Sequence, residues 1–203
     1  MTAQASIPGE RDHPSLALVN SRHNGRTGPV DHLAGPDDLR EWLAWRALVA
    51  RDPALTDADL DAAHALRDAV RELLVAAVEG RTPQPAAVAT VNDASAVAPA
   101  AEQLRWDAAG PERKRSTAAG EAQRALAALA EDAIALVCER RDDLIACEAP
   151  GCVRILLKDH PRRHWCSTRC GDRVRAARHY RRSREGSGQP TPPAPGGFVD
   201  GPA

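Results

Sequence analysis

Residues 147–170 of the 203-residue chain read CEAPGCVRILLKDHPRRHWCSTRC, and this stretch holds four of the five cysteines. They form two pairs: four residues separate Cys147 from Cys152, three separate Cys166 from Cys170, and thirteen lie between the pairs. Two pairs joined by a spacer are typical of chains that present four thiolates to one tetrahedral zinc ion. We therefore predict a Zn²⁺ site with Cys147, Cys152, Cys166 and Cys170 as ligands.

The spacer between the two pairs has the pattern of a β-hairpin. Val153, Ile155 and Leu157 alternate along its first half, as side chains on one face of a strand do. The Asp-His-Pro segment at residues 159–161 suits the bend, and Trp165 ends the returning arm, where it is expected to shield the metal. Because four thiolates leave no coordination position for water, we expect the zinc to stabilise this segment and not to catalyse hydrolysis.

Other uses of these cysteines remain open at the level of sequence. Two disulfides would employ the same residues, but the polar N-terminus has no apolar signal segment, and cytosolic thiols stay reduced. His160 or His164 can replace one cysteine as a ligand, and all four cysteines can be buried without metal. The fifth cysteine, Cys138, is predicted to be a small buried side chain.

The segment after the last cysteine, Asp172 to Arg184, reads DRVRAARHYRRSR and predicts a helix capped by Asp172. Val174, Ala177 and Tyr180 are expected to pack on the zinc hairpin. Arginines occupy the other faces, where they can contact phosphates or guanine edges in a major groove. The predicted nucleic-acid-binding residues lie on this helix and, as phosphate clamps, on the hairpin: Arg173, Arg175, Arg178, Arg181, Arg182, Arg162 and Arg163.

Charge is distributed unevenly along the chain. Residues 154–184 contain eleven Lys or Arg and two Asp, a net of +9, whereas the whole chain has a net charge of −1. An acidic body with one strongly basic end favours a polyanionic partner, although charge does not distinguish DNA from RNA. The scarcity of lysine beside many arginines indicates a GC-rich bacterial genome. Without a secretory signal or an apolar run of about 18 residues, we predict a cytoplasmic protein.

The rest of the chain predicts an α+β fold that is mostly helical, with a few short strands. Thr56 with Asp59 resembles a capping box, and Gly80 is a helix-terminating glycine. Helices are expected from 37 to before Pro53, from 56 to 80, from 85 to about 92 and from 116 to 140, with an extended segment at 96–107. The predicted domains are a helical domain at 16–143 and a zinc module at 144–185, between disordered ends at 1–15 and 186–203.

A polar cluster follows the apolar run at residues 16–19. Asn20, Ser21 and Arg22 are candidates for lining a small-molecule pocket, and the alternative is a hydrogen-bonded turn. The chain contains no glycine-rich phosphate loop, no His-Glu-x-x-His motif and no nucleophile elbow. We therefore expect a protein that is not an enzyme.

Two family resemblances cover the chain from about residue 16 to residue 184. The C-terminal part resembles the CGNR zinc finger, with Asp172 in place of the motif's Asn, in the order Cys147-x4-Cys152 and then Trp165-Cys166-Ser167-x-x-Cys170-Gly171-Asp172-Arg173. The upstream part resembles the ABATE domain that usually precedes this finger, at Leu18-Val19-Asn20-Ser21, Leu39 to Leu43 and Leu66 to Leu74. The resemblance implies a zinc-binding bacterial transcription regulator that binds DNA and responds to stress.

Three functions follow as hypotheses. The first is a zinc-dependent, DNA-binding transcription regulator, with a homodimer expected because one short helix rarely reads a long site alone. The alternatives are a zinc-stabilised module that docks an acidic protein, and a sensor that binds a small-molecule effector near Asn20. We also expect Cys166→Ser to release zinc and unfold the C-terminal module while residues 16–140 stay folded.

Overall fold

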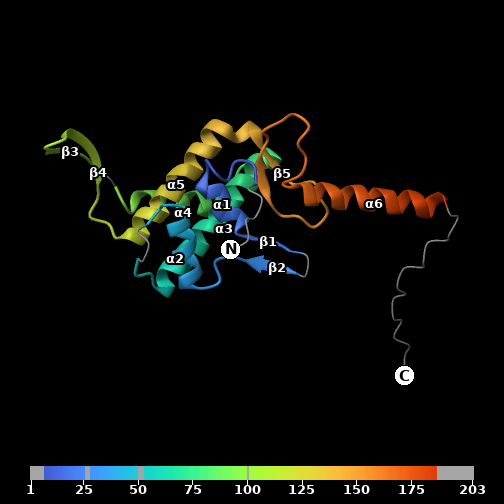
Figure 1. The fold of residues 1–203 in the computed structure, drawn as a ribbon, viewed down its shortest axis with the longest axis horizontal. Coiled ribbons are helices and arrows are strands. Elements are labelled where there is room, and N and C mark those ends of the chain that lie inside the picture. Colours follow the sequence, from blue (N-terminus) through green and yellow to red (C-terminus); the bar gives the residue numbers. More distant parts are fainter. Residues whose placement is uncertain (1–6, 26–27, 50–52, 100, 187–203) are drawn as a thin grey trace, which may run out of the picture.

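The computed structural model describes residues 7–25, 28–49, 53–99 and 101–186, and it confirms the α+β fold (Figure 1). The helices and one 3₁₀ turn are α1 (Pro14–Asn20), α2 (Pro36–Trp45), α3 (Asp57–Glu79), α4 (Pro85–Ala96), α5 (Glu121–Arg140), η1 (Arg141–Asp143) and α6 (Thr168–Gly186). The strands form antiparallel hairpins: β1 (Arg22–Asn24) with β2 (Pro29–Asp31), β3 (Ala101–Asp107) with β4 (Gly110–Ser116), and β5 (Leu144–Ala146) with β6 (Ile155–Leu157). None of the helices in these ranges has the length and apolar character needed to cross a membrane.

Helix α3 lies at the centre of the helical body, because α1, α4 and α5 all pack against it. Its predicted ends are confirmed. The Thr56 hydroxyl accepts a hydrogen bond from the Asp59 N–H, the Asp59 carboxylate accepts one from the Thr56 N–H, and Gly80 ends the helix with a φ of +66°. Leucine, valine and alanine side chains fill the core, and Leu66 and Val70 are buried at its centre.

Several predicted details of the helices are wrong. Helix α2 ends at Trp45, well before Pro53, because Ala47 takes a left-handed backbone with a φ of +56°. Helix α5 begins at Glu121 and not at residue 116, because β4 continues through residue 116. Cys138 is exposed and not buried, since it lies about 200° around α5 from the buried Leu136.

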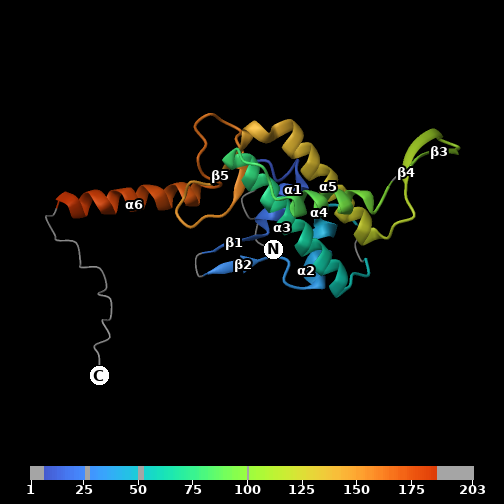
Figure 2. The ribbon, with the colours of Figure 1, turned by 180° about the vertical axis from the view of Figure 1, so that it is seen from behind.

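The β3–β4 hairpin extends from one end of the helical body, and α6 extends from the opposite end (Figures 1 and 2). The register of the β3–β4 hairpin pairs Leu104 with Arg113 and Trp106 with Pro111. Leu104 and Trp106 lie two residues apart and therefore share one face of the strand. However, their exposed fractions are 71% and 72%, so this face contributes nothing to the core.

Residues 7–15 are ordered, which corrects the prediction that residues 1–15 are disordered. Ile7 is buried beside the cysteine cluster, and the Pro8 carbonyl accepts a hydrogen bond from the Leu157 N–H at 3.1 Å. Gly9 has a φ of +92°, and a Cβ there would lie 2.9 Å from the side chains of Leu157 and Leu16. The other predicted disordered residues, 1–6 and 187–203, lie outside the described ranges.

Strand β6 contributes side chains both to the helical core and to the cysteine cluster. It pairs with β5, which precedes the first cysteine, and not with residues 162–166 as the predicted hairpin required. The apolar β5 can bury Leu144 beside Leu157, whereas the other arm begins Arg-Arg-His. Ile155 and Leu157 face the helical core, and Leu156 faces the cysteine cluster on the opposite side.

Candidate zinc centre and nucleic-acid interface

Four cysteine sulfurs converge between the β5–β6 hairpin and the start of α6. All four lie within 4.8 Å of one another, with 3.8 Å between Cys152 and Cys166 and 3.6 Å between Cys166 and Cys170. A tetrahedral zinc ion with Zn–S bonds of about 2.3 Å places its sulfurs about 3.8 Å apart. The arrangement therefore fits zinc, and each of these cysteines is a free thiol and not part of a disulfide.

Each ligand is held by local structure. Cys147 directly follows β5, and Cys152 closes a turn in which its N–H donates to the Ala149 carbonyl at 2.9 Å while Gly151 has a φ of +71°. The Cys166 N–H donates to the Cys147 sulfur at 3.4 Å and so joins the two pairs. Cys170 lies in the first turn of α6. The metal site therefore fixes the root of α6 to the hairpin.

The histidine alternative is not supported by this geometry. His164 Nδ1 contacts Glu148 Oε1 at 2.8 Å, and His160 Nδ1 accepts a hydrogen bond from the Arg162 N–H at 3.1 Å.

Hydrogen bonding with Cys147 raises the pKa of the Cys166 thiol, and hydrogen bonding with Cys152 lowers the pKa of Cys147. The crowded sulfurs thus need a cation before all four can be thiolates, and a closed four-thiolate set is typical of structural zinc.

Two family models match most of the chain. Residues 12–140 match ABATE, described as "Putative stress-induced transcription regulator", and residues 144–183 match the CGNR zinc finger. The chain belongs to the ABATE family. No curated protein matches its sequence. The CGNR match and the four clustered cysteines together identify Zn²⁺ as the cofactor. Below, the ABATE domain means residues 12–140 and the CGNR finger means residues 144–183.

Helix α6 begins at Thr168, one turn earlier than predicted. Ser167 caps it, because its Oγ accepts the Cys170 N–H at 3.3 Å and its carbonyl accepts the Gly171 N–H at 3.2 Å. Asp172 lies inside the helix and does not cap it; its carboxylate pairs with Arg175 at 2.6 Å. The overlooked signal was the serine three residues before Cys170, since serine is a favoured N-cap.

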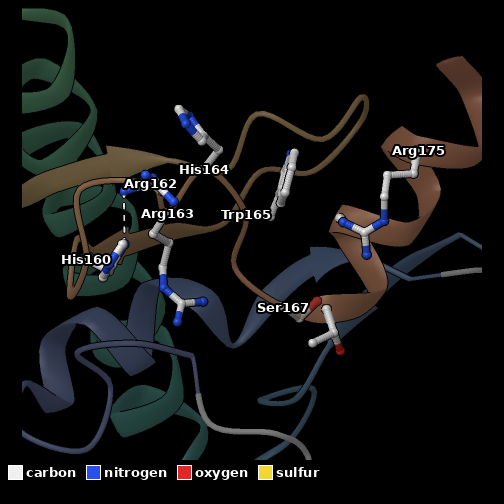
Figure 3. A pocket seen from close by; sticks show the side chains of 9 residues that line it. His160, Arg162, Arg163, His164, Trp165, Ser167 and Arg175 are labelled. Carbon is white, nitrogen blue, oxygen red and sulfur yellow. Dashed lines mark hydrogen bonds between the residues drawn. The ribbon is translucent and has the colours of Figure 1, made fainter.

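Gly171 allows the Trp165 indole to lie directly against α6. A Cβ at position 171 would lie 2.9 Å from Trp165 Cε3 and 3.1 Å from Arg175 Nη1. The Arg175 guanidinium carbon in turn lies 5.8 Å from the centre of the Trp165 ring (Figure 3). Trp165 is half-buried against the cysteine cluster, as expected of a residue that shields the metal.

The part of α6 beyond the cysteine cluster and Arg175, residues 176–183, is called the shaft here, and every residue in it is exposed. Val174 packs on the cysteine cluster as predicted. Ala177 and Tyr180 do not, because both are exposed on α6, which extends away from the body (Figure 1). The predicted contact residues Arg178, Arg181 and Arg182 lie on this shaft.

The remaining predicted nucleic-acid contacts lie on the loop after β6 or on α6 before the shaft. Arg173 Nη2 lies 3.7 Å from the Cys170 sulfur, where its charge supports the thiolate. Arg162, Arg163 and Arg175 come together with His160 and His164 around Trp165 (Figure 3). Sequence reasoning placed Arg175 with the shaft, and it missed that the loop at residues 160–165 folds against the helix beside it.

The predicted ligand residue Asn20 connects the ABATE domain to the finger. Its Nδ2 donates to the Ile155 carbonyl at 2.8 Å, and its Oδ1 accepts the Ile155 N–H at 3.0 Å. Nδ2 also donates to Glu10 Oε1 at 2.9 Å. The buried amide therefore pairs with β6 as a neighbouring strand would, and it completes the backbone bonding of Ile155.

Ser21 and Arg22, the other two candidate ligand residues, also contact protein groups. Ser21 Oγ donates to the Leu18 carbonyl at 2.7 Å and accepts from Arg67, and Arg22 pairs with Asp68. Arg67 is 1% exposed, and its two terminal nitrogens pair with both Asp31 carboxylate oxygens at 2.6 and 2.8 Å. The hydrogen-bonded turn accounts for these contacts, and an effector site here stays a prediction.

Proposed function

We propose that this protein is a zinc-dependent, DNA-binding transcription regulator whose shaft makes the DNA contacts. The observation that carries the proposal is the combination of a metal-fixed root and an exposed, arginine-bearing shaft that extends away from the body (Figure 1). The 19 residues of α6 span about 28 Å. A helix of about 10–12 Å diameter fits the major groove, which is about 12 Å wide.

The zinc site and the arginines have separate roles in this proposal. Zinc holds Cys170, and hence α6, at a fixed angle to the hairpin, which lowers the cost of orienting the helix on DNA. Arg178, Arg181 and Arg182 supply phosphate contacts and candidate contacts to guanine. The net charge of +9 over residues 154–184 accelerates the approach to a polyanion. The description of the ABATE family as a transcription regulator supports the same function.

Selection from a random duplex pool tests the proposal. The zinc-loaded chain is incubated with the pool at physiological salt, and the bound sequences are read and compared with the input. We expect an enriched motif, which the Arg178→Ala/Arg182→Ala variant loses. The matched control, Arg105→Ala/Lys114→Ala, removes the same charge from the β3–β4 hairpin, on the face opposite to Leu104 and Trp106, and should keep the motif. Binding without enrichment, or no binding, would overturn sequence-specific DNA recognition.

The exposed hairpin face favours a second function, protein–protein association. A two-stranded hairpin is marginally stable in water by itself, yet β3–β4 exposes Leu104 and Trp106 on the same face. Pairing of this face in a homodimer would bury both side chains, at the end of the body opposite to α6 (Figure 1). Sedimentation of the wild type and of Leu104→Ser/Trp106→Ser tests this association: a dimer that the variant loses supports it, and a monomeric wild type contradicts it.

A further inference from the structure

A cavity of about 270 Å³ lies where the loop after β6 meets the first turns of α6. Its lining includes three arginines, two histidines and one tryptophan (Figure 3): Arg162, Arg163, Arg175, His160, His164 and Trp165. Ser167 and Thr168, at the start of the helix, complete it together with Gly171, and the described part of the chain contributes no acidic side chain to the lining. A liquid water molecule occupies about 30 Å³, so the space accommodates a phosphate group with several waters.

We propose that this cavity binds one phosphate group, and that it does so as a site separate from the shaft. The inference rests on the proposed function in one respect, namely that the phosphate belongs to the backbone of the bound nucleic acid. A terminal or free phosphate has the same chemistry and is the alternative source. The cavity would then fix the register of the strand, while the shaft contacts the groove.

Two of the three guanidinium groups are already held in place. Arg175 lies between the Trp165 ring, at 5.8 Å from its centre, and Asp172, which accepts from its Nη2 at 2.6 Å. Arg163 donates through Nε and Nη2 to the two Asp159 oxygens. A guanidinium has five N–H donors, so each arginine keeps donors for a ligand. Groups that are held beforehand lose less conformational entropy when an anion binds.

Arg162 provides the charge that the protein itself does not neutralise. Its side chain is exposed and forms no ion pair within the described residues, whereas Arg163, Arg175 and His164 each have an acidic partner. An unpaired guanidinium beside two oriented ones matches an anion with several acceptor oxygens. The Trp165 indole also lines the cavity. It can lie against α6 only because Gly171 has no side chain.

A neighbouring cavity of about 410 Å³ is a poorer candidate for the phosphate. It shares Arg163, Ser167 and Thr168 with the first, but Asp159 and the apolar Ile7 and Pro8 belong to its lining. A carboxylate in the wall repels an anion, so the charge pattern assigns the phosphate to the first cavity.

The test uses the full zinc-loaded chain and the variant Arg162→Ala, with Arg105→Ala as the matched control for loss of one exposed charge. Three probes are titrated: inorganic phosphate, a duplex with 5′-hydroxyl ends, and the same duplex with 5′-phosphates. The ionic strength is held constant within each titration, and the duplex titrations are repeated at several salt concentrations. The readouts are duplex affinity against salt and the indole N–H resonance of Trp165 in a two-dimensional NMR spectrum. The chain has four tryptophans, and Trp165→Phe assigns the resonance.

We expect the 5′-hydroxyl duplex to shift the Trp165 resonance and Arg162→Ala to weaken duplex binding about eightfold at 0.1 M salt, with a salt slope smaller by about 0.9. Arg105→Ala should leave both unchanged. A shift caused only by inorganic phosphate or by the 5′-phosphorylated duplex would support the cavity and assign it to free or terminal phosphate. Duplex binding with an unmoved Trp165 resonance and normal affinity of Arg162→Ala would overturn the cavity and leave the proposed function standing. A shift induced by inorganic phosphate without any duplex binding would support the phosphate cavity and overturn the proposed function.

Discussion

Loss of zinc should destabilise the ABATE domain as well as the finger. The perturbation is Cys166→Ser, which removes the ligand whose sulfur lies 3.8 Å from Cys152 and 3.6 Å from Cys170. Sequence reasoning expected residues 16–140 to stay folded in this variant. The structure changes that expectation, because β6 contributes Ile155 and Leu157 to the helical core and Leu156 to the cysteine cluster.

The size of the effect follows from the side chains that the β5–β6 hairpin buries against the helices. Leu144, Ile155 and Leu157 have exposed fractions of 4%, 2% and 5%. Burying one such side chain is worth roughly 1.5–3 kcal/mol, so releasing all three costs the ABATE domain about 5–9 kcal/mol. Domains are stable by only about 5–15 kcal/mol, and with an m-value of about 2 kcal/mol/M in urea the unfolding midpoint should fall by about 2.5–4.5 M.

Two measurements together check this prediction. Urea unfolding followed by far-UV circular dichroism gives the midpoint, and hydrogen exchange of α3 peptides reports on the ABATE domain alone. Both are made with zinc content measured in parallel, and Cys138→Ser is the control because Cys138 is an exposed free thiol outside the cluster. A metal-free Cys166→Ser variant whose α3 amides exchange as slowly as those of the wild type would refute the shared-core reasoning.

Three further predictions concern buried polar groups. Asn20→Ala should lower the free energy of unfolding by about 1–3 kcal/mol for each Ile155 backbone group left unpaired. The control Asn24→Ala removes an exposed bond to Gly151 and should shift the urea midpoint very little. Equal losses in the two variants would contradict a stabilising role for the Asn20–Ile155 hydrogen bonds. Arg67→Ala leaves the Asp31 carboxylate without its cationic partner and should lower the free energy of unfolding by about 3–5 kcal/mol, measured in urea. A change below about 1 kcal/mol would show that the ion pair contributes little to stability. Burial lowers the pKa of His23 from 6.5 to about 4, aided by Arg154 and His32, so stability present above pH 6.5 should be lost as the pH falls toward 4, by about 3 kcal/mol at most. His23→Gln should flatten that part of the stability–pH curve relative to the wild type, and parallel curves would rule the histidine out.

Local signals predicted the features that depend on nearby residues. The capping residues of α3, the glycine that ends it and the spacing of the four cysteines each specify structure within a few positions, and all three are confirmed. The family resemblance was likewise carried by a compact motif around Cys170. Such features need no knowledge of distant contacts, because the hydrogen bonds or metal bonds that create them close short loops.

Features that depend on distant contacts were not predictable in the same way. The strand partner of β6 was assigned to the wrong side because pairing with β5 gains its advantage from burial against α3 and α1, which the finger sequence does not contain. Asn20 looked like a candidate ligand residue because its partner, Ile155, lies 135 positions away. The cavity beside Trp165 requires the loop after β6 to fold against the root of α6, a contact that a charge pattern cannot reveal.

The shared strand also bears on how such a protein can be inherited. A gene fragment that encoded only residues 144–183 would produce a peptide with Leu144, Ile155 and Leu157 facing water and without the Asn20 amide that completes the backbone bonding of Ile155. A fragment that encoded only residues 12–140 would lack the same hairpin on its own side. Recombination between the two coding regions would therefore separate one cooperative fold into two weak ones, and selection should keep the ABATE domain and its finger joined on a single chain.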